Sequence, residues 1–181
     1  MIIKDCKIEG LKVITPKIHT DNRGSFFEIF KSTIFEENGL PYNFLQDNQV
    51  ISKRGVLRGL HYQLNKPQGK FVQVIVGEIL DVAVDLRLGS STFGEYHLVE
   101  LSDKNKKLFY IPEGFAHGYL VISDYSIVVY KCTNIYDINS EYGIKWNDPD
   151  IGINWDNKFP ILSEKDKRLP LLKDQKFLPK F

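Results

Sequence analysis

The stretch KFVQVIVGEILDVAVDLR, residues 70–87, decides the fold class of this chain. Two runs rich in β-branched residues flank Gly77-Glu78, and such runs are typical of β-strands. A two-residue connection that begins with glycine suits the type II′ turn of a β-hairpin. In the second run Asp81 and Asp85 alternate with apolar side chains, so the two sets face opposite sides of the strand. The stretch therefore predicts a hairpin, with the two aspartates either inside a barrel or at the surface.

Short runs of the same kind recur along the chain, separated by turn residues. We expect strands at 25–31, 44–52, 96–101, 108–111, 118–122 and 126–132. The strands at 96–101 and 108–111 are expected to pair across a polar loop. The strands at 118–122 and 126–132 are expected to form a further pair. Only two helices are expected, at 32–38 and at a segment that begins near residue 163. Many short strands with few helices favour a mainly β protein, either a sandwich or a barrel.

Length and composition are ordinary for a globular protein. A chain of 181 residues suits one hydrophobic core, so we interpret residues 1–181 as a single domain. The net charge of +1 gives no strong field that would favour a nucleic acid or a membrane surface as partner. No run approaches the ~18 apolar residues of a transmembrane helix. The first residues lack the apolar segment of a secretory signal, and Cys6 and Cys132 are expected to be free thiols, so we predict a cytoplasmic protein.

Two of the four histidines lie in distinctive settings. His61 lies in RGVLRGLHYQ (54–63), and His117 lies in PEGFAHG (112–118), which fits the second metal motif of the small-barrel cupins. The first cupin motif requires a His-x-His pair, but Gln63 stands where the second histidine would be. An amide oxygen is a poor ligand for a transition metal. The sequence therefore predicts a cupin-like barrel without a metal.

A barrel without a metal leaves His61 available for acid–base chemistry. An imidazole with a pKa near neutrality suits proton abstraction. Such a base needs an acidic partner that fixes its tautomer, and a cation where negative charge develops. Lys70, at the head of its strand, could supply that cation. Tyr130 could return a proton from another side of the site.

Eight segments have the order and spacing of one known family, and together they are far more specific than any of them alone. They are DNRGSFFE (21–28), QDN (46–48), RGVLRGLHYQ (54–63), QGK (68–70), DVAVDLR (81–87), PEGFAHGY (112–119), YKCTN (130–134) and LSEKD (162–166). With these segments the chain resembles the dTDP-4-dehydrorhamnose 3,5-epimerases over nearly its whole length. It departs from the family pattern at Trp155-Asp156, where Trp-Pro is usual.

The resemblance implies a jelly-roll barrel with a few short helices, and a homodimer whose N-terminal strands are exchanged between the subunits. It implies an enzyme that uses neither a metal nor a nicotinamide cofactor. The implied substrate is the nucleotide sugar dTDP-4-keto-6-deoxy-D-glucose. Its hydrogens on carbons 3 and 5 both flank the ketone, so removal of either gives an enolate. Reprotonation from the opposite face would then give dTDP-4-keto-L-rhamnose, a step in dTDP-rhamnose biosynthesis.

The resemblance also implies roles for individual residues. His61 would be the general base, held by Asp166, while Lys70 would stabilise the enolate and Tyr130 would reprotonate carbon 5. Eight further residues are expected to bind the substrate: Arg58 and His117 in the pocket, Gln46 and Asn48 beside it, Tyr136 against the base, and Arg23, Phe26 and Glu28 at the nucleotide in the partner's site.

Two questions stay open at this point. Asp166 is the third residue after Ser163, in a pattern that resembles a helix capping box, so its carboxylate could cap a helix instead of holding the base. The scaffold could also carry a single-centre epimerase or a ketoisomerase acting on a related nucleotide sugar, or a non-catalytic barrel that binds sugar nucleotides. The presence of His61, Lys70 and Tyr130 speaks against the non-catalytic barrel.

Overall fold

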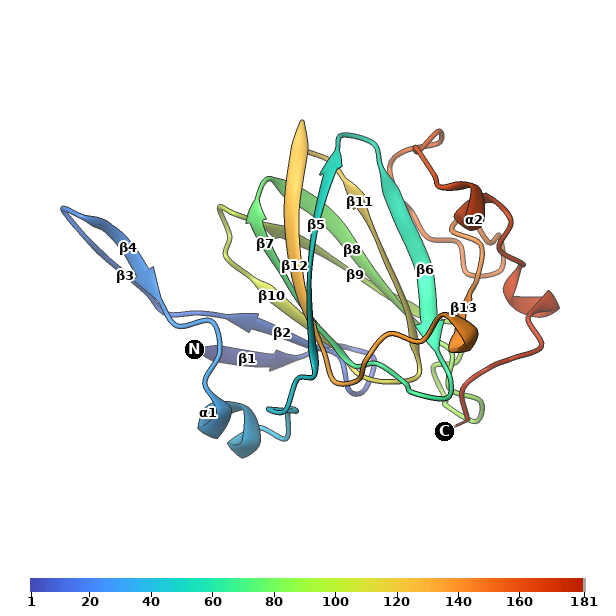
Figure 1. Ribbon diagram of the computed structural model, residues 1–181, viewed down its shortest axis with the longest axis horizontal. Helices are drawn as coiled ribbons and strands as arrows, with labels where there is room; N and C mark the ends of the chain where they lie inside the picture. The colour runs from blue at the N-terminus through green and yellow to red at the C-terminus, as the bar shows by residue number, and fades with distance from the viewer. Residues whose placement is uncertain (181) are drawn as a thin grey trace.

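Two antiparallel sheets and a small hairpin form the scaffold in residues 1–180, the part of the chain that this computed structural model describes (Figure 1). The six-stranded sheet has the order β1 (Ile2–Asp5), β2 (Lys12–Thr15), β10 (Leu108–Ile111), β7 (Lys70–Val76), β12 (Tyr125–Cys132) and β5 (Gln46–Lys53). The five-stranded sheet has the order β13 (Glu141–Gly143), β6 (Leu57–Gln63), β11 (Phe115–Val121), β8 (Glu78–Asp85) and β9 (Tyr96–Ser102). Strands β3 (Ile18–Asp21) and β4 (Gly24–Phe27) form the hairpin, which projects from the body of the molecule.

The main core lies between the two sheets. Strands of the six-stranded sheet contribute Val72, Val74 and Phe109, and the facing sheet contributes Ile79 and Leu101, all of them almost inaccessible to solvent. Apolar side chains on facing sheets exclude water together, which is the main stabilising contribution in such a sandwich. The predicted mainly β, cupin-like jelly roll is confirmed, and its two sheets stay separate instead of closing into one continuous barrel.

The predicted hairpin at Gly77-Glu78 is wrong, although both of its strands exist. Strand β7 pairs with β10 and β12, whereas β8 pairs with β9 and β11 in the other sheet. The chain therefore crosses from sheet to sheet at Gly77, whose φ is +86°. A Cβ at this position would lie 2.2 Å from the carbonyl oxygen of Tyr125, so the corner requires glycine for space as well as for backbone conformation.

The other two predicted hairpins are also sheet-to-sheet crossings. Strands β9 and β10 lie in different sheets, and so do β11 and β12. Side chains from these turns bond to the Gly77 corner: Asp103 Oδ2 accepts from Gly77 N at 2.7 Å, and Ser123 Oγ accepts from Glu78 N at 2.8 Å. The polar turn residues therefore join three corners to one another. A sequence that places strands correctly does not show which turns are hairpins and which are corners.

A second apolar layer covers the outer face of the five-stranded sheet. Ile144, Trp155 and Leu178 from the last part of the chain pack against strand residues such as Val82 and Leu120. The apolar set of β8 faces this layer. Asp81 and Asp85 lie on the other face of the strand and are fully buried, which resolves the alternative that the sequence left open.

The helices are few and short, as expected. Helix α1 (Ser32–Glu37) buries Phe35 in a cluster against the six-stranded sheet, and α2 (Glu164–Lys167) follows the cap Ser163. Two 3-10 turns, η1 (Ile138–Ser140) and η2 (Leu172–Asp174), complete the helical structure of residues 1–180. The strand expected at 25–31 ends at Phe27. None of the helices in residues 1–180 is long and apolar enough to cross a membrane.

Candidate active site

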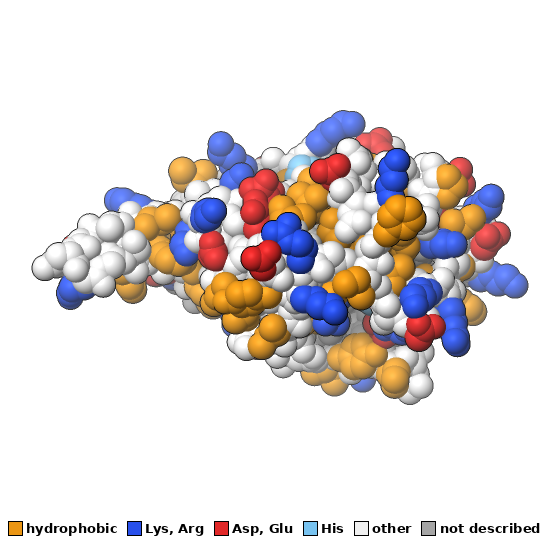
Figure 2. Space-filling model, turned by 90° about the horizontal axis from the view of Figure 1, so that it is seen from above, with side chains coloured by type: hydrophobic (Ala, Val, Ile, Leu, Met, Phe, Trp, Pro, Cys, Tyr) orange, Lys and Arg blue, Asp and Glu red, His pale blue; other side chains and the backbone are white. Residues whose placement is uncertain are grey.

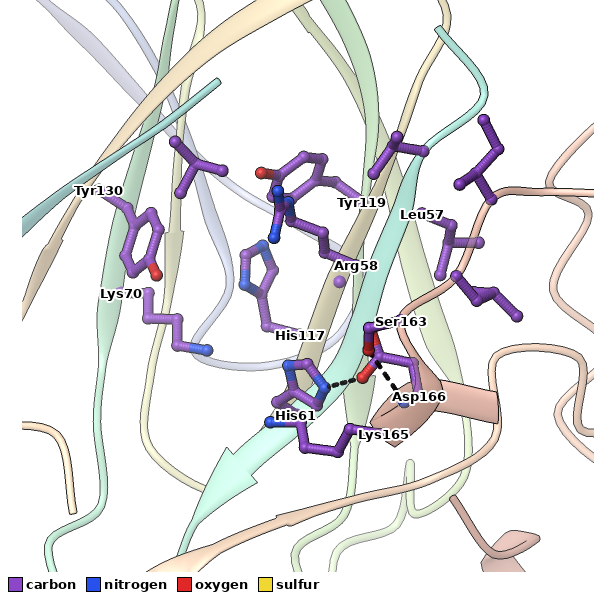
Figure 3. A pocket seen from close by; sticks show the side chains of 15 residues that line it. Leu57, Arg58, His61, Lys70, His117, Tyr119, Tyr130, Ser163, Lys165 and Asp166 are labelled. Carbon is purple, nitrogen blue, oxygen red and sulfur yellow. Dashed lines mark hydrogen bonds and ion pairs between the residues drawn. The ribbon is translucent and has the colours of Figure 1, made fainter. Parts of the chain in front are cut away.

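A pocket of about 370 Å³ opens between the two sheets (Figure 3). Its walls come from both sheets and from the segment 161–166. The polar side chains that line it are Arg58, His61, Lys70, His117, Tyr119, Tyr130, Ser163, Lys165 and Asp166. The structure thus brings together all four residues predicted to carry the chemistry, from three strands and one helix.

The His61–Asp166 pair forms one wall of the pocket. Asp166 Oδ1 lies 2.6 Å from His61 Nε2, and the aspartate side chain is only 4% exposed. Burial raises the pKa of Asp166, but the bond to His61 and the hydroxyl of Ser163 outweigh it and hold that pKa below its usual value. The carboxylate is therefore ionised at neutral pH, and it favours the tautomer in which Nε2 donates to it.

Asp166 also takes part in the helix cap, through a different atom. Its backbone N–H donates to Ser163 Oγ at 3.1 Å. The carboxylate therefore contacts the histidine instead of capping the helix, and the cap is completed by the main chain of Asp166.

A second histidine–carboxylate pair lies beside the first. His117 on β11 pairs across the ladder with His61 on β6. Its Nε2 lies 3.0 and 3.1 Å from the two carboxylate oxygens of Asp81 on β8. Burial lowers the pKa of His117, and the neighbouring carboxylate of Asp81 opposes that shift. The sequence did not assign Asp81 to the site, and its alternation along the strand left it either inside the barrel or at the surface.

Lys70 is one of three cationic side chains that line the pocket. Among residues 1–180 its amine has no hydrogen-bond or ion-pair partner, and Figure 3 shows it pointing toward the two histidines. Burial lowers the pKa of Lys70, while the nearby Cys132, Asp81 and Glu141 support its charge. An ammonium group held without a partner in a partly dry pocket is available to an anionic atom of a ligand.

Tyr130 and Arg58 complete the inner wall. Tyr130 lies on β12 next to Lys70, and burial raises the pKa of its phenol, so the group keeps its proton at neutral pH (Figure 3). Arg58 on β6 donates from Nε to Ser52 Oγ at 3.0 Å. Tyr119, which the sequence did not single out, buries its hydroxyl beside Arg58.

The predicted contacts Gln46, Asn48 and Tyr136 are not among the residues that line the pocket; they form a linked group outside it, in which Asn48 is paired across the ladder with Tyr130. Gln46 Nε2 donates to Asn48 Oδ1 at 2.9 Å, and Gln46 Oε1 accepts from the backbone N–H of Tyr136 at 2.7 Å. The phenol of Tyr136 donates to Glu141 Oε2 at 2.7 Å. Sequence analysis assigned no role to Glu141 or to its partner at 2.8 Å, Lys165, although Lys165 lies in one of the segments that carry the resemblance.

The structure does not bring Arg23, Phe26 and Glu28 to this pocket. Arg23 and Phe26 belong to the projecting β3–β4 hairpin and Glu28 follows it directly. Arg23 is bound to Asp21, with 2.7 Å between Nη2 and Oδ2. Phe26 is 73% exposed. Their predicted use in the site of a partner subunit stays a prediction.

The side chain of Gln63, which stands where the cupin motif has its second histidine, is hydrogen-bonded to the main chain and is not turned toward a metal position. Its Nε2 donates to the carbonyl oxygens of Lys66 and Ile135, and its Oε1 accepts from Asp137 N. These bonds hold the side-chain amide of Gln63 against the loop around residues 135–137. In residues 1–180 no three His, Cys, Asp or Glu side chains are grouped as a metal site.

Fold and site together define a class: a cupin-like jelly roll whose pocket is equipped for acid–base chemistry. The family model for dTDP-4-dehydrorhamnose 3,5-epimerase matches residues 5–174. The dTDP-4-dehydrorhamnose 3,5-epimerase of Methanothermobacter thermautotrophicus is 54% identical over 170 residues, which cover 92% of each chain. This chain belongs to the dTDP-4-dehydrorhamnose 3,5-epimerase family.

Solved structures agree with this assignment. The dTDP-6-deoxy-D-glucose-3,5-epimerase of Legionella pneumophila, crystallised with dTDP-4-keto-L-rhamnose, has a TM-score of 0.95 and 47% identity, and the match covers 99% of this chain and 98% of that one. A 3′-monoepimerase of Streptomyces bikiniensis in complex with dTDP-quinovose has a TM-score of 0.91 and 34% identity, with 97% and 91% covered. Close similarity of fold therefore extends to enzymes that invert a single centre.

Proposed function

We propose that this protein inverts carbons 3 and 5 of dTDP-4-keto-6-deoxy-D-glucose and so produces dTDP-4-keto-L-rhamnose for dTDP-rhamnose biosynthesis. Membership of the family supports the reaction class. The observation that carries the proposal is the His61–Asp166 pair at 2.6 Å, in a pocket that also holds the amine of Lys70, which has no partner in residues 1–180.

His61 acts as the base through Nδ1, because Asp166 holds Nε2. Nδ1 takes the proton from carbon 3 or carbon 5, and the electrons of the broken C–H bond form a C=C bond to carbon 4. The carbonyl electrons move onto the oxygen, which becomes an enolate. The ammonium of Lys70 stabilises that negative charge where it develops.

Tyr130 returns the proton from the other side. Inversion requires that the acid and the base lie on opposite faces of the sugar. His61 lies on β6 of the five-stranded sheet, whereas Tyr130 lies on β12 of the six-stranded sheet that faces it. A sugar held between the sheets is therefore open to the base on one face and to the phenol on the other. Burial keeps this phenol protonated, as an acid must be.

The remaining predicted residues bind the substrate. Arg58 and His117 line the pocket and hold the sugar and the phosphates. Gln46 and Asn48 make further contacts with the substrate, and Tyr136 stacks on the base. The projecting β3–β4 hairpin carries Arg23 and Phe26 into the site of a second subunit, in a homodimer of single-domain chains working in the cytoplasm without a cofactor. The exposure of that hairpin supports this arrangement.

A single-centre epimerase is the second candidate, because a 3′-monoepimerase shares the fold at a TM-score of 0.91. Identity favours inversion at both centres, since it is 47% to the Legionella 3,5-epimerase and 34% to the monoepimerase. Purified protein should convert dTDP-4-keto-6-deoxy-D-glucose to dTDP-4-keto-L-rhamnose, as identified by the proton couplings at carbons 3 and 5 in the NMR spectrum. A product inverted at one carbon would replace this proposal with the second candidate.

A further inference from the structure

Glu141 places a second carboxylate beside His61, opposite Asp166. It lies on β13, which pairs with β6 so that Gly143 is opposite His61. Glu141 Oε1 is 3.9 Å from His61 Nδ1, and its side chain is 17% exposed. That distance is too long for a hydrogen bond but short enough for a direct charge interaction. The imidazole therefore has an acidic group near each of its two nitrogens.

Two neighbours fix the position of this carboxylate. Lys165 Nζ lies 2.8 Å from Glu141 Oε2, and the phenol of Tyr136 donates to the same oxygen at 2.7 Å. Oε1, the oxygen nearer to His61, is left without a hydrogen bond among the described residues. Burial raises the pKa of Glu141, but the bonds from Lys165 and Tyr136 and the proximity of His61 outweigh it and hold that pKa below its usual value. Glu141 is therefore an anion at neutral pH.

The charge of Glu141 reaches the other reacting groups as well. It supports the charged form of Lys70 and raises the pKa of Tyr130. Asp166, in contrast, contacts only His61 among these three. Glu141 thus interacts electrostatically with His61, Lys70 and Tyr130, although it does not line the pocket itself.

We propose that Glu141 is a positioning residue that orients His61 from the Nδ1 side and stabilises the imidazolium formed when the substrate loses its proton. This inference rests on the proposed function, because it assigns proton abstraction to His61. A fixed negative charge about 4 Å from Nδ1 favours the protonated ring, so it lowers the barrier to proton transfer. The bonds from Lys165 and Tyr136 prevent Glu141 from turning away into solvent.

Other charged groups also face His61, so a test must distinguish the effect of Glu141 from theirs. Asp166 and Lys165 come from α2, His117 from β11 with Asp81 behind it, and Lys70 from β7. Neutralisation of Glu141 leaves all of these in place. Glutamine retains an oxygen that can accept from Lys165 and Tyr136, so Glu141→Gln removes charge while changing the packing very little.

Glu164→Gln is the matched control. Glu164 lies two residues from Asp166 on α2, but its side chain is 73% exposed and paired with Lys167 at 2.6 Å. Both variants remove one negative charge from the same neighbourhood, and only one of them changes a group near Nδ1. The protonation midpoint of His61 can be followed by NMR of labelled histidine, with His61→Asn used for assignment. The acid limb of the kcat/KM profile provides the second measurement.

In Glu141→Gln we expect the His61 midpoint and the acid limb to move to lower pH, and kcat to fall about tenfold. Glu164→Gln should move neither. Glu141→Asp keeps the charge but withdraws it by one methylene, so it should give a smaller shift of the same sign; it also decides the matter if the glutamine variant fails to fold.

An unchanged His61 midpoint in folded Glu141→Gln, with only a raised KM, would overturn the proposal and assign Glu141 to substrate binding. The NMR titration needs no turnover. A wild-type protein without epimerase activity would refute the proposed function, whereas the titration would still decide the effect of Glu141 on the histidine.

Discussion

Asp166→Asn should separate catalysis from helix capping, because the structure assigns these roles to different atoms of one residue. Asparagine keeps the backbone N–H that donates to Ser163 Oγ, so the cap remains. Its side-chain amide replaces a charged acceptor 2.6 Å from His61 Nε2 with a neutral group that can also donate. A donor at that position favours the tautomer with its proton on Nδ1, which cannot act as the base.

The loss of kcat expected for Asp166→Asn can be estimated from the hydrogen bond between Asp166 and His61. A hydrogen bond to a buried charge contributes about 2 kcal/mol, and 1.4 kcal/mol corresponds to about a factor of ten in rate. Loss of this bond alone slows the reaction about 30-fold, and the unfavourable tautomer brings the total to about 10²- to 10³-fold in kcat. The free energy of unfolding should fall by only about 1 kcal/mol, since a neutral hydrogen bond can still form.

Ser163→Ala is the matched comparison. It removes the cap and lowers the free energy of unfolding by about 1 kcal/mol, but it leaves the carboxylate on His61. The two variants should therefore have similar urea midpoints, while kcat falls only in Asp166→Asn. If Asp166→Asn kept kcat within about threefold of wild type and lost stability as Ser163→Ala does, Asp166 would have a structural role only.

Three further predictions concern the corner, a buried carboxylate and the acid. Gly77→Ala should lower the free energy of unfolding, measured in urea, by at least about 2 kcal/mol, because its Cβ would meet the Tyr125 carbonyl. Gly39→Ala is the control: it has open space around it and should lower the free energy of unfolding by about 1 kcal/mol. Burial raises the pKa of Asp85, but its bonds to Arg87, Ser90 and Thr92 bring that pKa down to about 2 from 3.8. The resulting stabilisation of about 2 kcal/mol is fully present above about pH 5 and is lost as pH falls through about 2. Asp85→Asn should therefore be less stable than wild type at pH 7 and approach it near about pH 1 in thermal unfolding. Tyr130→Phe should retain deuterium exchange of the substrate in heavy water but lose inversion at carbon 5 by about 10²-fold or more, as followed by NMR.

Eight of the thirteen strands in residues 1–180 could be predicted from the sequence, but β1, β2, β3, β6 and β13 were not among them, and strand partners could not be predicted at all. Runs of β-branched residues locate a strand because the local backbone and the burial of its side chains favour it. Sheet membership depends on long-range packing, and Gly77-Glu78 has the same chemistry in a hairpin turn as in a corner between sheets. Asp103 and Ser123 join the corners of this jelly roll, and their spacing in sequence does not show it.

The same distinction between local sequence and long-range pairing applies to the residues of the candidate site. His61, Lys70 and Tyr130 lie in segments whose local pattern is distinctive, so the sequence identified them. Glu141 lies outside those segments, and Asp81 lies in one of them but was given no role. Each reaches its histidine through the register of a strand pair, β13 with β6 and β8 with β11. Only a three-dimensional structure gives that register.

Deuterium exchange in heavy water tests the central claim most directly. The substrate dTDP-4-keto-6-deoxy-D-glucose is incubated with wild type and with His61→Asn, each shown to be folded by circular dichroism, and carbons 3 and 5 are followed by NMR. If His61 is the base for both centres, wild type incorporates deuterium at both carbons and His61→Asn at neither. Exchange that persists in folded His61→Asn would contradict the assignment of the base, and exchange at one carbon in wild type would contradict inversion at both centres.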